Sequence, residues 1–125
     1  MRDIELYLLV AAGGFAGASA RYLINGLAPS MPGILLINVL GCMVLGFLLY
    51  ASLFTGMFSP TVRAVFGSGF IGAFTTFSTF SVQTLQASPE IAILNVLGNL
   101  FLGLAGVLIG RQAAMLLARR PGWTS

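Results

Sequence analysis

The sequence predicts an all-α membrane protein with four transmembrane helices, in a single domain over residues 1–125. Of its residues, 58% are hydrophobic and only 7% are charged, whereas a soluble domain carries about 25% charged residues. Four nearly uncharged stretches each reach the roughly 20 apolar residues that cross a bilayer. The segments between them contain Pro with Gly or Ser, which are common in turns. We therefore expect lipid to be the main solvent of this chain.

The four spans follow one another with short connections. They run from about Ile4 to Leu23, from about Ile34 to Phe54, from about Ala64 to Leu85, and from about Ile91 to Ile109 or a turn beyond. The connections read APSMPG, TGMFSP and QASPE. The first and fourth spans are rich in Gly, and Gly13 with Gly17 forms a small-xxx-small pair that favours close helix packing.

The third span is the most polar of the four. Between Ala64 and Leu85 it holds seven Ser or Thr residues and Gln83, including the stretch GAFTTFSTFS at residues 72–81. Gly69 and Gly72, followed by two Thr, are poor helix formers. We expect an unwound point here near mid-membrane, where free carbonyls are tolerated only beside a cavity or an ion. Such carbonyls are hard oxygen ligands, suited to a cation such as Na⁺.

Three amide side chains lie in the second and fourth spans. They are Asn38, Asn95 and Asn99, and the last two are one helical turn apart on one face. An amide in hydrocarbon needs hydrogen-bond partners. These residues could line a polar pathway, or they could simply bond one helix to another.

The basic residues are distributed unequally between the two ends of the spans. The chain has six Arg and no Lys, and five of the six fall on the side of both termini, namely Arg2, Arg63, Arg111, Arg119 and Arg120. The other side has Arg21 and Glu90. By the positive-inside rule, both termini of this multi-pass protein are expected in the cytoplasm.

The polar groups within the spans suit an anion. No Asp or Glu occurs between Leu6 and Glu90, so a carboxylate ring for cations and a carboxylate proton relay are both excluded. Amide and hydroxyl groups donate hydrogen bonds, and the edge of a Phe ring is positive. Arg21 adds a fixed positive charge, although an ordinary interfacial Arg is an equally good interpretation.

The motifs GGFAGASARY, INVLGCMVLG and GFIGAFTTFSTFS, in this order in a four-span chain, resemble the Fluc (CrcB) fluoride channels. The resemblance implies an antiparallel dual-topology dimer in the cell (inner) membrane that exports cytoplasmic fluoride passively through two pores, with a structural Na⁺ at its centre. It implies that the ring edges of Phe77 and Phe80 face fluoride beside the Asn38 amide, and that the Gly72 and Thr75 carbonyls hold Na⁺. The remaining implied positions are Ser78, Thr79 and Ser81 along the polar path, and Arg21 near the aqueous vestibule.

This chain departs from the family pattern at three points. Gln83 stands where the family often has an acid, and Gly103 where it often has Ser, so Asn95 and Asn99 are candidates to supply the outer end of the polar path. In addition, five Arg against one is not the balance expected of a chain that inserts both ways. We therefore hypothesise that this chain is one half of a heterodimer with an oppositely oriented homologue, and a homodimer is the alternative.

Other classes of protein fit the sequence less well. A small drug or proton antiporter would need an intramembrane carboxylate, which is absent. An assembly subunit would explain the Gly-rich packing but not the cluster of Phe and hydroxyl groups. An enzyme is disfavoured because no His or intramembrane acid could activate a hydroxyl nucleophile.

Overall fold

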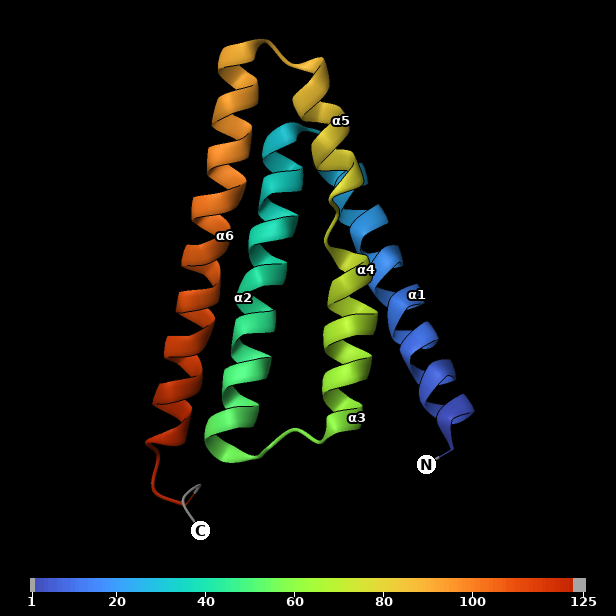
Figure 1. The fold of residues 1–125 in the computed structure, drawn as a ribbon, viewed down its shortest axis with the longest axis vertical. Helices are drawn as coiled ribbons and strands as arrows, with labels where there is room; N and C mark the ends of the chain where they lie inside the picture. The colour runs from blue at the N-terminus through green and yellow to red at the C-terminus, as the bar shows by residue number, and fades with distance from the viewer. Residues whose placement is uncertain (1, 123–125) are drawn as a thin grey trace.

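The fold is a bundle of helices. The chain reverses direction at two connections at one end of the bundle and at one connection at the other end (Figure 1). The computed structural model describes residues 2–122, so Met1 and residues 123–125 of the predicted domain lie outside it. Within that range it has helices and no strand, and four of its helical spans are long and apolar enough to cross a membrane. The predicted all-α class with four spans is thus confirmed.

The observed spans are longer than the predicted ones. They are α1 (Asp3–Leu27), α2 (Met31–Thr55), a third span over Pro60–Gln86, and α6 (Pro89–Ala118). Both termini lie at the same end of the bundle in Figure 1, as four crossings require. The extra turns fall at the span ends, where a helix continues beyond the apolar stretch that sequence reasoning detects.

The third span is divided into several segments. These are α3 (Pro60–Val62), the π-helix η1 (Arg63–Ile71), α4 (Gly72–Phe74), a non-helical break over residues 75–77, and α5 (Ser78–Gln86). The break that the sequence predicts is confirmed, and it begins at Thr75, whose backbone is extended (φ −75°, ψ 160°). The π-helix was not predicted, because hydrophobic periodicity does not distinguish it from an α-helix.

Local signals explain where the helices begin and end. The hydroxyl of Ser30 accepts the Gly33 N–H at 3.2 Å and caps α2, and Ser59 accepts the Val62 N–H at 3.2 Å to cap α3. After α2 the chain turns at Gly56, whose φ of 64° lies in the left-handed region that favours Gly.

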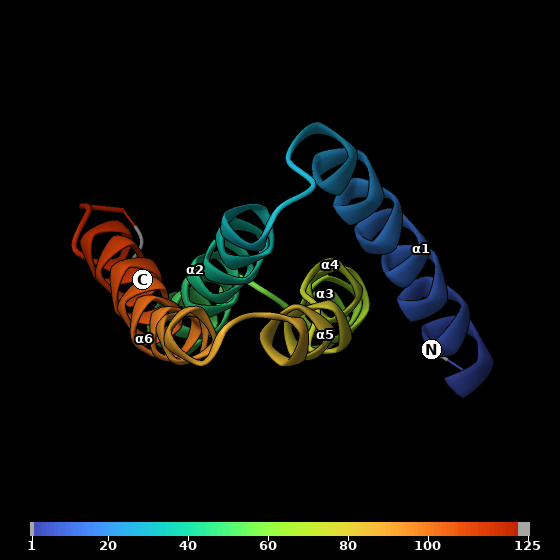
Figure 2. The same ribbon diagram turned by 90° about the horizontal axis from the view of Figure 1, so that it is seen from above.

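The four spans stand in a row (Figure 2), in the order α6, α2, third span, α1. Glycines allow close approach in this row: a Cβ at Gly106 of α6 would lie 3.0 Å from the Val39 carbonyl oxygen of α2, and one at Gly13 of α1 would lie 2.6 Å from that of Val65 in η1. The predicted small-residue packing is therefore present at α1 and at α6.

The core is small and most large side chains face outward. Ile34, Ile37 and Phe74 form a buried cluster between α2 and the third span. By contrast, Phe15 is 78% exposed and Leu27 is 88% exposed. An apolar exterior of this extent matches a lipid environment.

Candidate functional site

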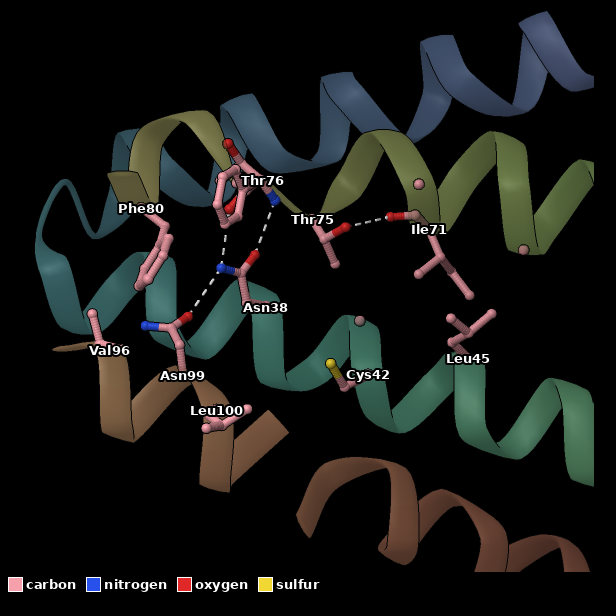
Figure 3. A pocket seen from close by; sticks show the side chains of 14 residues that line it. Asn38, Cys42, Leu45, Ile71, Thr75, Thr76, Phe80, Val96, Asn99 and Leu100 are labelled. Carbon is pink, nitrogen blue, oxygen red and sulfur yellow. Dashed lines mark hydrogen bonds between the residues drawn. The ribbon is translucent and has the colours of Figure 1, made fainter. Parts of the chain in front are cut away.

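The candidate site is a groove of about 570 Å³ beside the break in the third span (Figure 3). Its walls come from α2, the third span and α6. It brings together six of the predicted site residues, which are Asn38, Gly72, Thr75, Phe77, Phe80 and Asn99. The other five, Ser78, Thr79, Ser81, Asn95 and Arg21, are not among the groove-lining residues.

Two of the backbone N–H groups that leave the α-helical pattern at the break donate to side chains instead. The Thr76 N–H donates to Asn38 Oδ1 at 2.9 Å, whereas an α-helix would direct it to the Gly72 carbonyl. The Thr79 N–H donates to Thr76 Oγ1 at 3.2 Å instead of to the Thr75 carbonyl. The Gly72 and Thr75 carbonyls therefore both lose their α-helical donors.

Asn38 is bonded on every side within the chain. In addition to accepting from Thr76, its Nδ2 donates to the Thr76 carbonyl at 3.1 Å and to Asn99 Oδ1 at 3.1 Å (Figure 3). Both hydrogens of its amide are thus used in this conformation. Asn38 lines the groove, but a ligand would have to displace one of these bonds to reach its donors.

A series of side-chain hydrogen bonds continues from Asn38 into α6 and α5. Asn99 Nδ2 donates to the Asn95 carbonyl at 2.9 Å and to Asn95 Oδ1 at 3.1 Å. Asn95 Nδ2 donates to Thr84 Oγ1 at 2.9 Å, and the Thr84 hydroxyl donates to the Phe80 carbonyl at 2.7 Å. We call Asn38, Asn99, Asn95 and Thr84 the amide relay.

The amide relay shows what sequence reasoning did and did not find. The shared face of Asn95 and Asn99 is confirmed by their bond one helical turn apart. Thr84 was counted among the hydroxyls of the third span, but it was not singled out as a partner of Asn95. Its contact with α6 depends on how α6 packs against α5 after the turn at residues 87–88, and the sequence around the turn does not specify that packing.

The two phenylalanines lie together at the groove. The ring centroids of Phe77 and Phe80 are 5.6 Å apart, with an interplanar angle of 44°. Phe77 is 80% exposed, and Phe80 packs against the core cluster of Ile34, Ile37 and Phe74. The groove therefore presents one ring that is held by packing and one that is largely open.

The predicted hydroxyls near these rings bond locally. Ser81 Oγ donates to the Phe77 carbonyl at 2.8 Å, one turn back in its own helix. Thr79 Oγ1 accepts from Thr76 Oγ1 at 3.2 Å, and the Ser78 and Thr76 hydroxyls are 3.3 Å apart. The buried Thr76 side chain, just before α5, therefore contacts both of these hydroxyls.

Arg21 reaches the break from α1. Its Nη1 donates to the Thr75 carbonyl at 3.3 Å, which places a positive charge beside the unwound segment. From the sequence, Arg21 is expected near the aqueous vestibule, and its bond to the Thr75 carbonyl is not predicted. On α2, a Cβ at Gly41 would overlap the Thr75 methyl group, so Gly41 lets the break approach that helix.

Two of the departures from the family pattern are single residues, Gln83 and Gly103, and the structure shows the surroundings of each of them. Gln83 Oε1 is buried and has no hydrogen-bond partner within residues 2–122. A Cβ at Gly103 would lie 3.5 Å from Cys42 Sγ, which is an ordinary contact. Among these residues no three His, Cys, Asp or Glu gather in one place.

Comparison with known proteins gives a consistent result. Residues 8–111 match the family described as CrcB-like protein, Camphor Resistance (CrcB). The chain is 46% identical over 115 residues to fluoride-specific ion channel FluC 1 of Methanospirillum hungatei, covering 92% of this chain and 81% of that one. It is 44% identical over 125 residues to fluoride-specific ion channel FluC of Methanocaldococcus jannaschii, covering 93% of this chain and 99% of that one.

Proposed function

Because this chain belongs to the CrcB family of ion channels, whose relatives are named fluoride-specific, we propose that it is a fluoride channel. The observation that carries the proposal is the groove, where two phenylalanine rings lie beside amides with no carboxylate nearby. Ring edges and N–H or O–H donors stabilise an anion, whereas an acid would repel it. The lack of an intramembrane acid also argues against a proton-coupled antiporter.

The proposed pathway runs from the groove toward α5. Phe77 and Phe80 offer their ring edges, and the amide relay offers donors where an anion displaces an internal bond. We expect transport to be passive, because no carboxylate lies between Leu6 and Glu90 to couple the movement of protons. Fluoride that enters a cell as HF and ionises there would leave through this path.

A dimer would complete the site. The groove lies on a face where Phe77 is 80% exposed, and half-buried amides open to lipid are costly. An antiparallel partner over this face would enclose two pores. The partner is a second copy or an oppositely oriented homologue, and the numbered relatives, such as FluC 2 of Methanosarcina acetivorans, are compatible with the second arrangement.

The carbonyls of Gly72 and Thr75 fit a structural Na⁺ at the dimer centre. Both have lost their α-helical donors, and carbonyl oxygens are hard ligands for a hard cation. When bound, the ion would supply the positive charge that holds carbonyls of two subunits together. Arg21 already donates to the Thr75 carbonyl, so this oxygen would serve two cationic partners.

The test is anion efflux from liposomes that contain this chain alone, with fluoride compared with chloride. Fast fluoride efflux without chloride efflux would support the proposal and show that one kind of chain suffices. Fluoride efflux only after a homologue is added would support the paired arrangement. Equal efflux of both anions, or none under either condition, would refute a fluoride-specific channel.

A further inference from the structure

The break in the third span is maintained by side chains rather than by the ordinary helical pattern. Asn38 Oδ1 accepts the Thr76 N–H at 2.9 Å, and Thr76 Oγ1 accepts the Thr79 N–H at 3.2 Å. In an uninterrupted α-helix these two donors would go to the Gly72 and Thr75 carbonyls, four residues earlier. Side-chain acceptors thus take up the helical donors of these two released carbonyls.

We propose that Asn38 and Thr76 are positioning residues that create the cation site by taking up the two N–H groups belonging to the Gly72 and Thr75 carbonyls. Neither side chain contacts the ion in this role. Each acts by satisfying a backbone donor that would otherwise close the helix over a cation ligand. This role rests on the proposed sodium site and identifies the side chains that make it.

The surroundings show why an ordinary helix does not re-form. Asn38 also donates to the Thr76 carbonyl at 3.1 Å, so both backbone polar groups of Thr76 are held by one amide from α2. Thr76 is 6% exposed, so water does not compete for these groups. Without Asn38, the buried Thr76 N–H would be unsatisfied unless it returned to the Gly72 carbonyl.

The test measures how Na⁺ stabilises the purified full chain against heat in detergent. Sodium chloride is titrated against N-methyl-D-glucamine chloride at constant ionic strength, and the sodium concentration for half-maximal stabilisation is recorded. A ligand that binds only the folded state raises stability with its concentration. Thr76→Val keeps the shape of the side chain but removes the acceptor for the Thr79 N–H.

We expect Thr76→Val to raise this sodium concentration at least about tenfold, the factor that corresponds to about 1.4 kcal/mol. Thr76→Ser retains a hydroxyl and should restore the wild-type value. The matched control is Thr55→Val, because the Thr55 hydroxyl also accepts a backbone N–H, that of Met57 at 3.1 Å, but lies at the end of α2. This control should keep the wild-type sodium concentration.

Unchanged sodium dependence in a folded Thr76→Val protein would overturn the inference, as would a wild type that Na⁺ does not stabilise. If Thr76→Val does not fold, amide hydrogen exchange of the wild type gives a second test. Slow exchange of the Thr76 and Thr79 amides without Na⁺ is expected, and fast exchange of both would overturn the inference. Fluoride efflux is measured separately from thermal stability. A chain that carries no fluoride would refute the proposed channel function without changing the outcome of the sodium titration.

Discussion

The contact between α2 and α6 can be tested with one substitution at two positions of the same helix. A Cβ at Gly110 would overlap the Met43 carbonyl oxygen and lie 2.6 Å from the Phe47 nitrogen, so it would meet rigid backbone on α2. A Cβ at Gly98 would meet only Leu35 Cδ2, at 3.8 Å. The helices must therefore separate for Gly110→Ala but not for Gly98→Ala.

The expected magnitudes follow from two opposing effects. Replacing Gly by Ala inside a helix favours folding by about 0.8–1.0 kcal/mol. Overpacking costs about 1–3 kcal/mol, and contact with backbone atoms of two α2 residues places Gly110 at the upper end of that range. We expect Gly98→Ala to stabilise the protein by up to about 1 kcal/mol, and Gly110→Ala to destabilise it by about 2 kcal/mol.

The assay is reversible unfolding in mixed micelles with increasing SDS, followed by circular dichroism, for the wild type and both variants. The difference between the variants should be about 3 kcal/mol, with opposite signs relative to the wild type. Equal changes in both variants would refute the view that Gly110 is required for close approach of these helices.

Three further predictions concern the groove and its surroundings. Phe77→Ile and Phe80→Ile should each reduce fluoride efflux from liposomes, and Phe77→Ile should leave the yield of folded protein unchanged because that ring is 80% exposed; wild-type efflux in both would contradict the ring-edge role. Asn95→Leu removes a bond to Thr84 and one from Asn99, and at about 0.6 kcal/mol per bond in a membrane it should cost about 1 kcal/mol in SDS unfolding; no measurable loss would mean that these bonds do not stabilise the fold. Gly103→Ser should unfold at the wild-type SDS concentration, since its Cβ has room beside Cys42 Sγ, and a large drop would contradict this packing.

Much of the fold could be predicted because it depends on composition and spacing. Apolar length located four spans, and the Gly and Thr residues of the third span located its break to within a turn. The predicted weak points were Gly69, Gly72 and the two Thr that follow them; the Gly residues remain helical and the chain unwinds at Thr75 and Thr76. The reason is that Gly lowers helix stability wherever it stands, whereas the break forms where Asn38 supplies an alternative partner for the backbone.

The site was less predictable for the same reason. Asn38 and Thr76 are 38 residues apart, and their bonds exist only because α2 packs against the third span. The Ser81 hydroxyl, expected along the polar path, instead bonds the Phe77 carbonyl of its own helix. A hydroxyl can satisfy itself locally in this way, so its presence in a sequence does not fix the direction in which it points.

The amide relay also has a direction, and a single peptide unit sets it. Because Thr76 needs an oxygen at its N–H and a nitrogen at its carbonyl, the Asn38 amide cannot be reversed without breaking both bonds. Asn99 must then present its oxygen to Asn38 and its nitrogen toward Asn95, which in turn donates to Thr84. The donors consequently point in one direction along the relay, from Asn38 at the break to the Thr84 hydroxyl, which donates to the Phe80 carbonyl. Turning any one amide of the relay around would place two donors or two acceptors opposite each other, so the direction of the whole series is fixed together.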